Sequence, residues 1–116
     1  MGGRSTQRTR GDIFWVDLTD TRGHEQGGRR PAIVLAVSYG GMTIAVPLTT
    51  TINAFRFPHT HAICCNRENG LSADSAALVF QIVSLSGDRF REKIGRSSGE
   101  DMEAITILLK DLLSIE

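Results

Sequence analysis

Five apolar residues in a row, Ile33 to Val37, constrain the fold of this chain more than any other feature. An almost continuous apolar run predicts a central strand that is covered on both faces, because neither face offers polar groups to water. Pro31 stands at the start of this strand, a position that tolerates the missing N–H of proline. The chain therefore needs core on both sides of one strand.

Shorter apolar segments supply the neighbouring strands. They are separated by turn signals, among them Tyr39-Gly40-Gly41 and Asn69-Gly70. The expected strands lie at residues 12–18, 42–48, 60–65 and 75–83. Strands at such short intervals, joined by glycine turns, favour a small barrel, so the chain is expected to be mainly β with some α.

Two helices are expected in the last third of the chain. Ser86-Gly87-Asp88 can open a short helix that runs to Ile94 and ends at Gly95. Ser97 or Ser98 can cap a final helix, which acidic residues in its first turn would favour. This helix carries one apolar stripe at helical spacing, predicted to be a core or dimer contact: Met102, Ile105, Leu109, Leu112 and Leu113.

The length of 116 residues allows one compact domain, expected at residues 10–116. Residues 1–9 are Gly, Ser, Thr, Gln and Arg with no apolar anchor beyond Met1, which predicts a disordered basic tail. No apolar run approaches the length of a bilayer span, and the N-terminus lacks a signal-peptide core. We therefore expect no membrane contact.

The two cysteines, Cys64 and Cys65, are adjacent, so an ordinary disulfide between them would be badly strained. Neighbouring side chains of a strand point to opposite faces, which predicts one buried and one outward-facing thiol. Unpaired thiols fit a reducing compartment, and a cytoplasmic location is expected.

Charge is balanced overall but unevenly distributed. The formal net charge is zero, which excludes a global basic field for nucleic acid. Residues 1–60 hold seven arginines and four acids, a balance of +3, whereas residues 61–116 hold six basic and nine acidic residues, a balance of −3. Eleven of the thirteen basic residues are arginine, which is suited to bidentate contact with phosphate, so a local basic face remains open.

The stretch from Gly23 to Pro31 concentrates chemistry between two strand-like runs. It holds an imidazole, a carboxylate, an amide and two guanidiniums around the pair Gly27-Gly28. Most loops of this kind do nothing chemical. Here the mixture of side chains predicts a functional site on the edge of a rigid sheet.

Four sequence blocks occur together in this chain: 10–18 (RGDIFWVDL), 23–32 (GHEQGGRRPA), 46–50 (VPLTT) and Gln81-Ile82. They resemble the MazF/PemK family, whose members are ribosome-independent mRNA endonucleases and the toxin halves of prokaryotic toxin–antitoxin pairs. The resemblance implies an SH3-like barrel with a C-terminal helix, assembled as a homodimer. It also implies cleavage of single-stranded RNA without a cofactor, and inhibition by a cognate antitoxin.

By the same resemblance, four residues are expected to be catalytic. Arg30 matches the arginine before proline in the family's loop, and its guanidinium would stabilise charge on the phosphate. Thr49 matches a hydroxyl of the third strand that would donate to the same phosphate. Glu25 matches a loop glutamate and His24 a histidine of some members, and they are candidates for base and acid. For Glu25 an equal alternative is holding Arg29 or Arg30 in place, and for His24 the alternative is an exposed loop imidazole.

Further residues are expected to contact RNA rather than to transfer protons. They are Gln26, Arg29, Thr50, Phe80 and Gln81. Many family members carry Asp or Glu at the position of Phe80, and an apolar side chain cannot replace an acid. Phe80 is therefore either a residue that stacks on a base or, more simply, a core residue on a strand.

Two other constellations are weaker. His59 and His61 precede the two cysteines, but a strand would let at most one thiol join both imidazoles, which leaves three ligands. No metal is therefore expected. The second is a basic cluster around the predicted short helix: Arg89, Arg91, Lys93 and Arg96. We expect these side chains to form a solvated face, and the alternative is that they border an RNA groove.

The sequence thus predicts a sequence-selective, metal-independent endoribonuclease. The products expected from attack of the 2′-OH are a 2′,3′-cyclic phosphate and a 5′-OH. One alternative is a non-catalytic relative that binds RNA or an antitoxin. Another is a toxin of the same fold that poisons a protein such as gyrase, although the set of Glu25, Arg30 and Thr49 argues against it.

Overall fold

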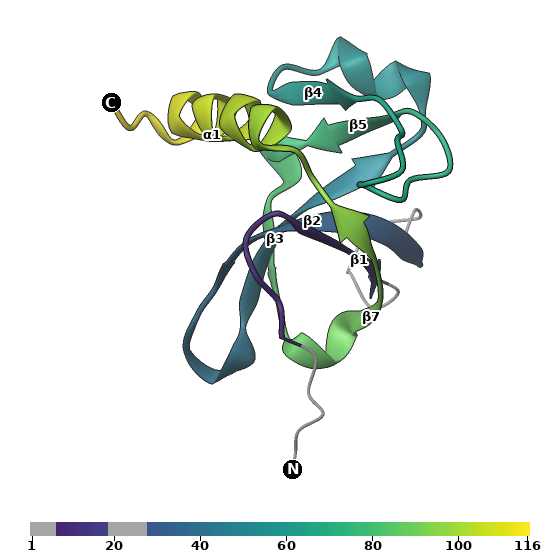
Figure 1. Cartoon of the computed structure of the whole chain (residues 1–116). Helices are drawn as coiled ribbons and strands as arrows, with labels where there is room; N and C mark the ends of the chain where they lie inside the picture. The colour runs from purple at the N-terminus through teal and green to yellow at the C-terminus, as the bar shows by residue number, and fades with distance from the viewer. Residues whose placement is uncertain (1–6, 19–27) are drawn as a thin grey trace.

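The computed structural model describes residues 7–18 and 28–116, and these form one antiparallel sheet with a helix at the C-terminus (Figure 1). The sheet order is β4-β5-β3-β2-β1-β7, and β6 pairs with β3. The strands are β1 (Asp12–Asp17), β2 (Arg29–Val37), β3 (Thr43–Thr49), β4 (Thr60–Ile63), β5 (Ser75–Leu78), β6 (Val83–Leu85) and β7 (Phe90–Arg96).

Strand β2 lies at the centre, as its apolar run predicts. Ile33 and Leu35 belong to one buried cluster, while Ala32 and Val34 belong to a second one on the opposite face. The two clusters lie on the two faces because successive side chains of a strand alternate. Ala36 and Val37 are exposed, so the double burial ends before the strand does.

The predicted fold class, mainly β with a C-terminal helix, is confirmed. Register shifts in the β1–β7 and β2–β3 pairs mark bulges, and the extra residues lie on β7 and β2. Such bulges bend a strand and increase its twist. The sheet is nevertheless not closed, since no ladder joins β6 to β7 among the described residues.

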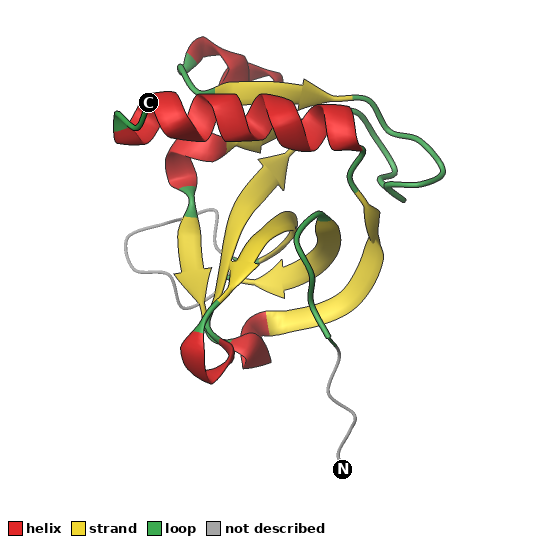
Figure 2. Cartoon of the chain, turned by 60° about the vertical axis from the view of Figure 1, so that its left-hand side comes forward, coloured by secondary structure: helices red, strands yellow, loops and turns green. Residues whose placement is uncertain are grey.

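Helix α1 (Gly99–Leu113) packs against β4 and lies across one end of the sheet (Figure 2). The Oγ atom of Ser98 accepts a hydrogen bond from the backbone N–H of Asp101 at 3.0 Å, which identifies Ser98 as the predicted cap. Ile105 is fully buried, and the other core contacts of the helix are Met102, Leu108, Leu109 and Leu112.

One residue of the predicted apolar stripe does not face the core, and for that residue the alternative of a dimer contact stays a prediction. Leu113 is 52 % exposed, and Leu108 takes its place against the core. Leu112 and Leu113 are consecutive and point about 100° apart around the helix, so only one of them can face the sheet. No helix in the described part of the chain combines the length and apolar character that a membrane span requires.

The predicted short helix from Ser86 to Ile94 is wrong. Only Gly87–Arg89 form a 3₁₀ turn, and Phe90–Arg96 form β7 instead. Strand β7 pairs with β1, where Asp12 lies opposite Arg96 and Val16 opposite Phe90. This distant partner decides the conformation, because a strand gains its hydrogen bonds from outside its own segment.

The strand expected at residues 75–83 is divided in two. Strands β5 and β6 both pair with β3, and the 3₁₀ turn Val79–Gln81 separates them. Between Ala77 and Val83 the chain advances six residues while β3 advances three, from Leu48 to Ala45. The turn takes up the excess and lifts Phe80 and Gln81 out of the sheet.

The prediction of one buried and one exposed thiol is wrong, since both Cys64 and Cys65 are exposed and unpaired. Strand β4 ends at Ile63, so neither cysteine lies on a strand face. At the N-terminus, the Arg8 side chain donates to the Thr43 hydroxyl at 3.1 Å, and the Thr9 N–H donates to Asp12 at 2.9 Å. Residues 1–6 of the predicted tail lie outside the described residues.

Candidate functional site

The site lies where β1 ends and β2 begins. The N–H of Leu18 donates to the carbonyl of Gly28 at 2.8 Å, and the register places Asp17 opposite Arg29. The segment 19–27 therefore leaves and rejoins the sheet beside the two arginines. His24, Glu25 and Gln26 belong to that segment and lie outside the described residues.

Arg30 and Thr49 come together at this end of the sheet. Strands β2 and β3 are antiparallel, with Ala32 opposite Pro47, and two residues further along each strand stand Arg30 and Thr49. Both are half-buried, and both line the same two cavities. A guanidinium and a hydroxyl are thus held on adjacent strands of the sheet, and they are the two residues that the family resemblance implies for a phosphate site.

The first cavity, called here the Trp15 cavity, has a volume of about 330 Å³. It contains the expected contact residues Arg29 and Thr50 in addition to Arg30 and Thr49. The remainder of its wall is mixed apolar and hydroxyl surface: Trp15, Pro31, Leu48, Gly70, Leu71, Ser72, Ala73, Ser75 and Ile94.

The second cavity, called here the Phe80 cavity, has a volume of about 190 Å³ and lies on the other side of the Arg30–Thr49 pair. It contains the expected contact residues Phe80 and Gln81. Its other described lining residues are Thr51, Asn53, Ala54, Arg56, Phe57 and Leu78. Phe80 is neither on a strand nor fully buried: it packs half-buried on a 3₁₀ turn.

The hydroxyl of Thr49 is oriented by the backbone that directly follows β3. Its Oγ1 atom accepts a hydrogen bond from the Thr51 N–H at 3.2 Å. A hydroxyl that accepts one bond still has its proton to donate. Thr49 can therefore act as a donor to an oxygen placed between the two cavities.

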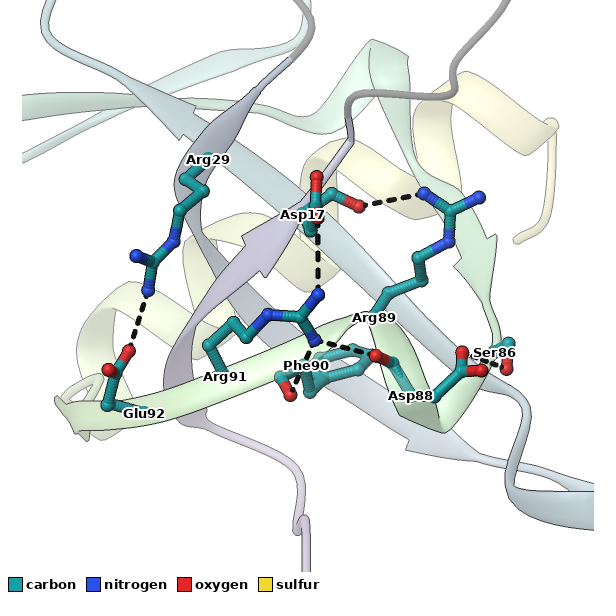
Figure 3. A network of polar contacts seen from close by, with 8 residues as sticks. All are labelled: Asp17, Arg29, Ser86, Asp88, Arg89, Phe90, Arg91 and Glu92. Carbon is teal, nitrogen blue, oxygen red and sulfur yellow. Dashed lines mark hydrogen bonds and ion pairs between the residues drawn. The ribbon is translucent and has the colours of Figure 1, made fainter.

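Arg29 is held by contacts with β7 and β1. Its guanidinium pairs with Glu92 of β7 at 2.7 Å (Figure 3). It also lies 5.8 Å from the centre of the Trp15 ring. A hydrogen bond from the backbone N–H of Glu92 and the nearby charge of Arg29 hold the pKa of Glu92 below its ordinary value. Arg29 is thus fixed on the wall of the Trp15 cavity by an acid and an aromatic ring.

The predicted basic cluster follows β7 rather than a helix, and its cations are matched by acids of β1. Arg91 lies 3.2 Å from the Asp17 carboxylate, and Arg89 donates to the Asp17 carbonyl at 3.2 Å (Figure 3). Lys93 and Arg96 both pair with Asp12. These four cations are bound to acids or backbone carbonyls of the sheet. None of them lines the Trp15 cavity or the Phe80 cavity.

The two histidines that precede the cysteines are bound to helix α1. Nε2 of His59 lies 2.8 Å from Asp111, and Nε2 of His61 lies 2.8 Å from Asp101. In residues 7–18 and 28–116, no three His, Cys, Asp or Glu side chains are grouped closely enough to hold a metal ion. The four side chains join β4 and the turn before it to the helix.

Among the residues of the Phe80 cavity that sequence reasoning missed are Asn53, Arg56 and Phe57. They lie in or directly after the 3₁₀ helix Ile52–Arg56, a segment in which the sequence pattern predicted neither a strand nor a helix. A signal was present in the pair Arg56-Phe57, because basic residues next to aromatic ones are typical of nucleic-acid surfaces.

Comparison with known proteins places the chain in a family. Residues 9–113 match the family model described as PemK-like, MazF-like toxin of type II toxin–antitoxin system. The chain is 32 % identical over 100 residues to Endoribonuclease MazF of Staphylococcus saprophyticus, covering 83 % of this chain and 82 % of that protein.

Solved structures show the same fold. MazF from Deinococcus radiodurans superposes with a TM-score of 0.76 at 27 % identity, covering 96 % of this chain and all of that one. An endoribonuclease in complex with its cognate antitoxin, from a mycobacterial species, gives a TM-score of 0.73 at 21 % identity, covering 95 % of this chain and 98 % of that one. On the extent of the family match, this chain belongs to the PemK-like and MazF-like toxins of type II toxin–antitoxin systems.

Proposed function

We propose that this protein is a sequence-selective endoribonuclease that cuts single-stranded RNA, including mRNA, without a metal ion. The observation that carries the proposal is the placement of Arg30 and Thr49 between two cavities. A phosphate held by this pair would have one neighbouring nucleotide on each side. The curated relative at 32 % identity is named an endoribonuclease, which supports the same activity.

The reaction needs no external nucleophile. The 2′-oxygen of the ribose attacks the adjacent phosphorus while a base accepts the 2′-OH proton. The bond from phosphorus to the 5′-oxygen then breaks, and an acid protonates that oxygen. The products are a 2′,3′-cyclic phosphate and a 5′-OH, so a base, an acid and donors to the phosphorane supply the required chemistry.

Arg30 and Thr49 serve the phosphorane. The guanidinium stays charged at any working pH and donates to two phosphate oxygens at once. The Thr49 hydroxyl donates a further hydrogen bond. Both side chains stand on strands of the central sheet, so little reorganisation is needed when the negative charge develops.

Glu25 and His24 are the proposed proton-transfer groups. They belong to the segment 19–27, whose two ends are joined beside Arg29 and Arg30. A carboxylate and an imidazole are the side-chain types that commonly exchange protons near neutral pH. Gln26, Arg29 and Thr50 are proposed to grip the RNA on the same side.

The proposed assembly is a cytoplasmic homodimer that a cognate antitoxin inhibits. A mycobacterial relative of the same fold has been solved with its antitoxin, and a MazE–MazF complex from Deinococcus radiodurans is also similar. An acidic and apolar antitoxin segment would complement Arg29, Arg30 and the exposed part of Trp15. It would thereby cover the phosphate site.

The test is incubation of the purified protein with a long RNA in the presence of EDTA. We expect cleavage at a limited set of sequences, with 5′-OH ends that accept phosphate from a polynucleotide kinase. An Arg30→Ala preparation, purified in the same way, controls for contaminating nucleases. Binding of RNA without cleavage would favour the non-catalytic alternative, and loss of cleavage in EDTA with rescue by Zn²⁺ would overturn the metal-independent mechanism.

A further inference from the structure

We propose that the Phe80 cavity is a stacking subsite for one unpaired nucleobase, next to the phosphate held by Arg30 and Thr49. The inference rests on the endoribonuclease function proposed above and assigns the specificity-determining residues of that site. They are Phe57 and Phe80, which stack on the base, and Asn53 and Gln81, which contact its edge.

Two aromatic rings form the floor of this cavity. The ring centres of Phe57 and Phe80 are 5.4 Å apart, and the ring planes are inclined by 37°. Phe57 is 48 % exposed and Phe80 is half-buried, so the pair offers apolar surface to a ligand. Every base has a π-face, and stacking on exposed aromatic rings is the usual way in which proteins bind unpaired bases.

The rings are fixed before any ligand arrives. Phe80 packs against a small cluster made of Ala54, Ala76 and Leu78, and Phe57 immediately follows the 3₁₀ helix that contains Ala54. The alanines let the ring approach the strand closely. A platform that is already ordered loses little side-chain entropy when a base binds.

The charge around the rings favours a nucleotide over an apolar peptide. The Arg56 guanidinium lies 5.7 Å from the centre of the Phe57 ring, and Arg30 stands at the border with the Trp15 cavity. The described lining residues of the Phe80 cavity include no acid. A nucleotide within an RNA chain has a phosphate on each side. Its two phosphates would therefore meet the cations of this wall, Arg30 and Arg56.

The volume and the polar rim of the Phe80 cavity fit one base. The volume of about 190 Å³ lies below the roughly 300–1,000 Å³ of pockets for drug-sized ligands, so it suits a single ring system. Asn53 and Gln81 are exposed amides on the rim, and an amide offers both donors and an acceptor. They can therefore tell one base edge from another.

The experiment pairs protein variants with altered substrates. A short RNA that contains one cleavage site, mapped on the long transcript, is made with an abasic ribose at each position in turn. For the wild-type protein, one position next to the cleaved phosphate should lower kcat/KM by about 5- to 150-fold, the scale of stacking a base on an aromatic side chain. Phe57→Leu and Phe80→Leu should lower cleavage of the intact RNA on the same scale.

The decisive result is the combination of the two changes. On the RNA that is abasic at the sensitive position, the leucine variants should cleave no more slowly than the wild type, because the contact is already absent. Phe55→Leu is the matched control, since Phe55 is 47 % exposed in the same 3₁₀ helix as Asn53 and Arg56 but does not line the cavity. It should cleave every RNA at the wild-type rate, and thermal unfolding should show that all three variants fold.

Additive losses at every position, or no sensitive abasic position, would overturn the stacking subsite while leaving the nuclease intact. If the wild type cleaves no RNA, an uncleavable oligonucleotide with a 2′-deoxy residue and 2-aminopurine replaces the substrate. Fluorescence quenching on binding that Phe80→Leu abolishes and Phe55→Leu preserves would then support the subsite although the proposed catalysis has failed. Equal quenching by both variants would overturn it.

Discussion

Arg30 of β2 and Thr49 of β3 line both the Trp15 cavity and the Phe80 cavity. The two residues follow the antiparallel register that pairs Ala32 with Pro47. Their separation along the chain is nineteen positions, yet the sheet brings a guanidinium and a hydroxyl to one point.

Arg30→Ala should lower kcat by at least roughly 100-fold, the scale for losing one donor to a transition state. Arg29→Ala should cost much less, because Arg29 is bound to Glu92 and lies over Trp15. Single-turnover cleavage of one RNA by both variants measures the difference. Equal losses would mean that the two arginines share the role of gripping RNA.

Thr49→Val should lower kcat by roughly 10- to 100-fold, because valine keeps the shape of threonine but removes the donor to the phosphorane. Thr51→Val is the matched control, since Thr51 lines the Phe80 cavity and its backbone N–H, which valine retains, makes the bond to Thr49. The comparison needs kcat at saturating RNA. Similar kcat values for the two variants would assign Thr49 to the structure of the turn.

His24→Ala and Glu25→Gln should change the pH dependence of cleavage while leaving RNA affinity nearly intact. An unperturbed imidazole has a pKa of about 6.5, so loss of His24 should remove a limb of the profile near neutral pH. Glu25→Gln keeps size and hydrogen bonding but removes the charge. If Glu25 only orients an arginine, its rate loss will be smaller and the profile will keep its shape.

Affinity and single-turnover rates measured across pH separate these roles. Variants that bind weakly but cleave bound RNA with normal rate and pH dependence would show that residues 24 and 25 act as a clamp. Catalysis would then rest on Arg30 and Thr49.

Asp12→Asn should destabilise the fold by about 1.5–3 kcal/mol, the usual value of hydrogen bonds to a charged group. The Asp12 side chain is 2 % exposed and pairs with Lys93 and Arg96 of β7. Glu92→Gln is the control. The ion pair between Glu92 and Arg29 is exposed at the surface, so its loss should lower the free energy of unfolding far less. Urea unfolding of both variants at neutral pH gives the comparison.

The contribution of Asp12 should also disappear in acid. Burial by itself raises the pKa of Asp12, but hydrogen bonds from Thr9 and Lys93 outweigh it and hold the pKa below its ordinary value. A carboxyl whose pKa is lowered by folding stabilises the protein above its unfolded pKa of about 3.9 and loses that effect as the pH falls further. The stability gap between wild type and Asp12→Asn should therefore be constant down to about pH 4 and shrink below it.

The candidate site was predictable where it depended on residue type and missed where it depended on packing. The resemblance of short sequence blocks to a known family predicted four site residues that the structure brings to one end of the sheet: Arg30, Thr49, Phe80 and Gln81. The partner of Phe80, Phe57, could not be foreseen as such. The two are neighbours because β5 ends in a 3₁₀ turn beside the helix Ile52–Arg56, a contact between segments more than twenty residues apart.

By itself the sequence determined the features that depend on neighbouring residues. The apolar run of β2 predicted burial on both faces, and Ser98 predicted the start of α1. Tertiary structure decided the rest: residues 90–96 become β7 because β1 offers hydrogen bonds and acids to them, and residues 75–85 divide because both halves must pair with β3. A helix satisfies its own backbone, whereas a strand takes its partner from a distant part of the chain, which no local pattern encodes.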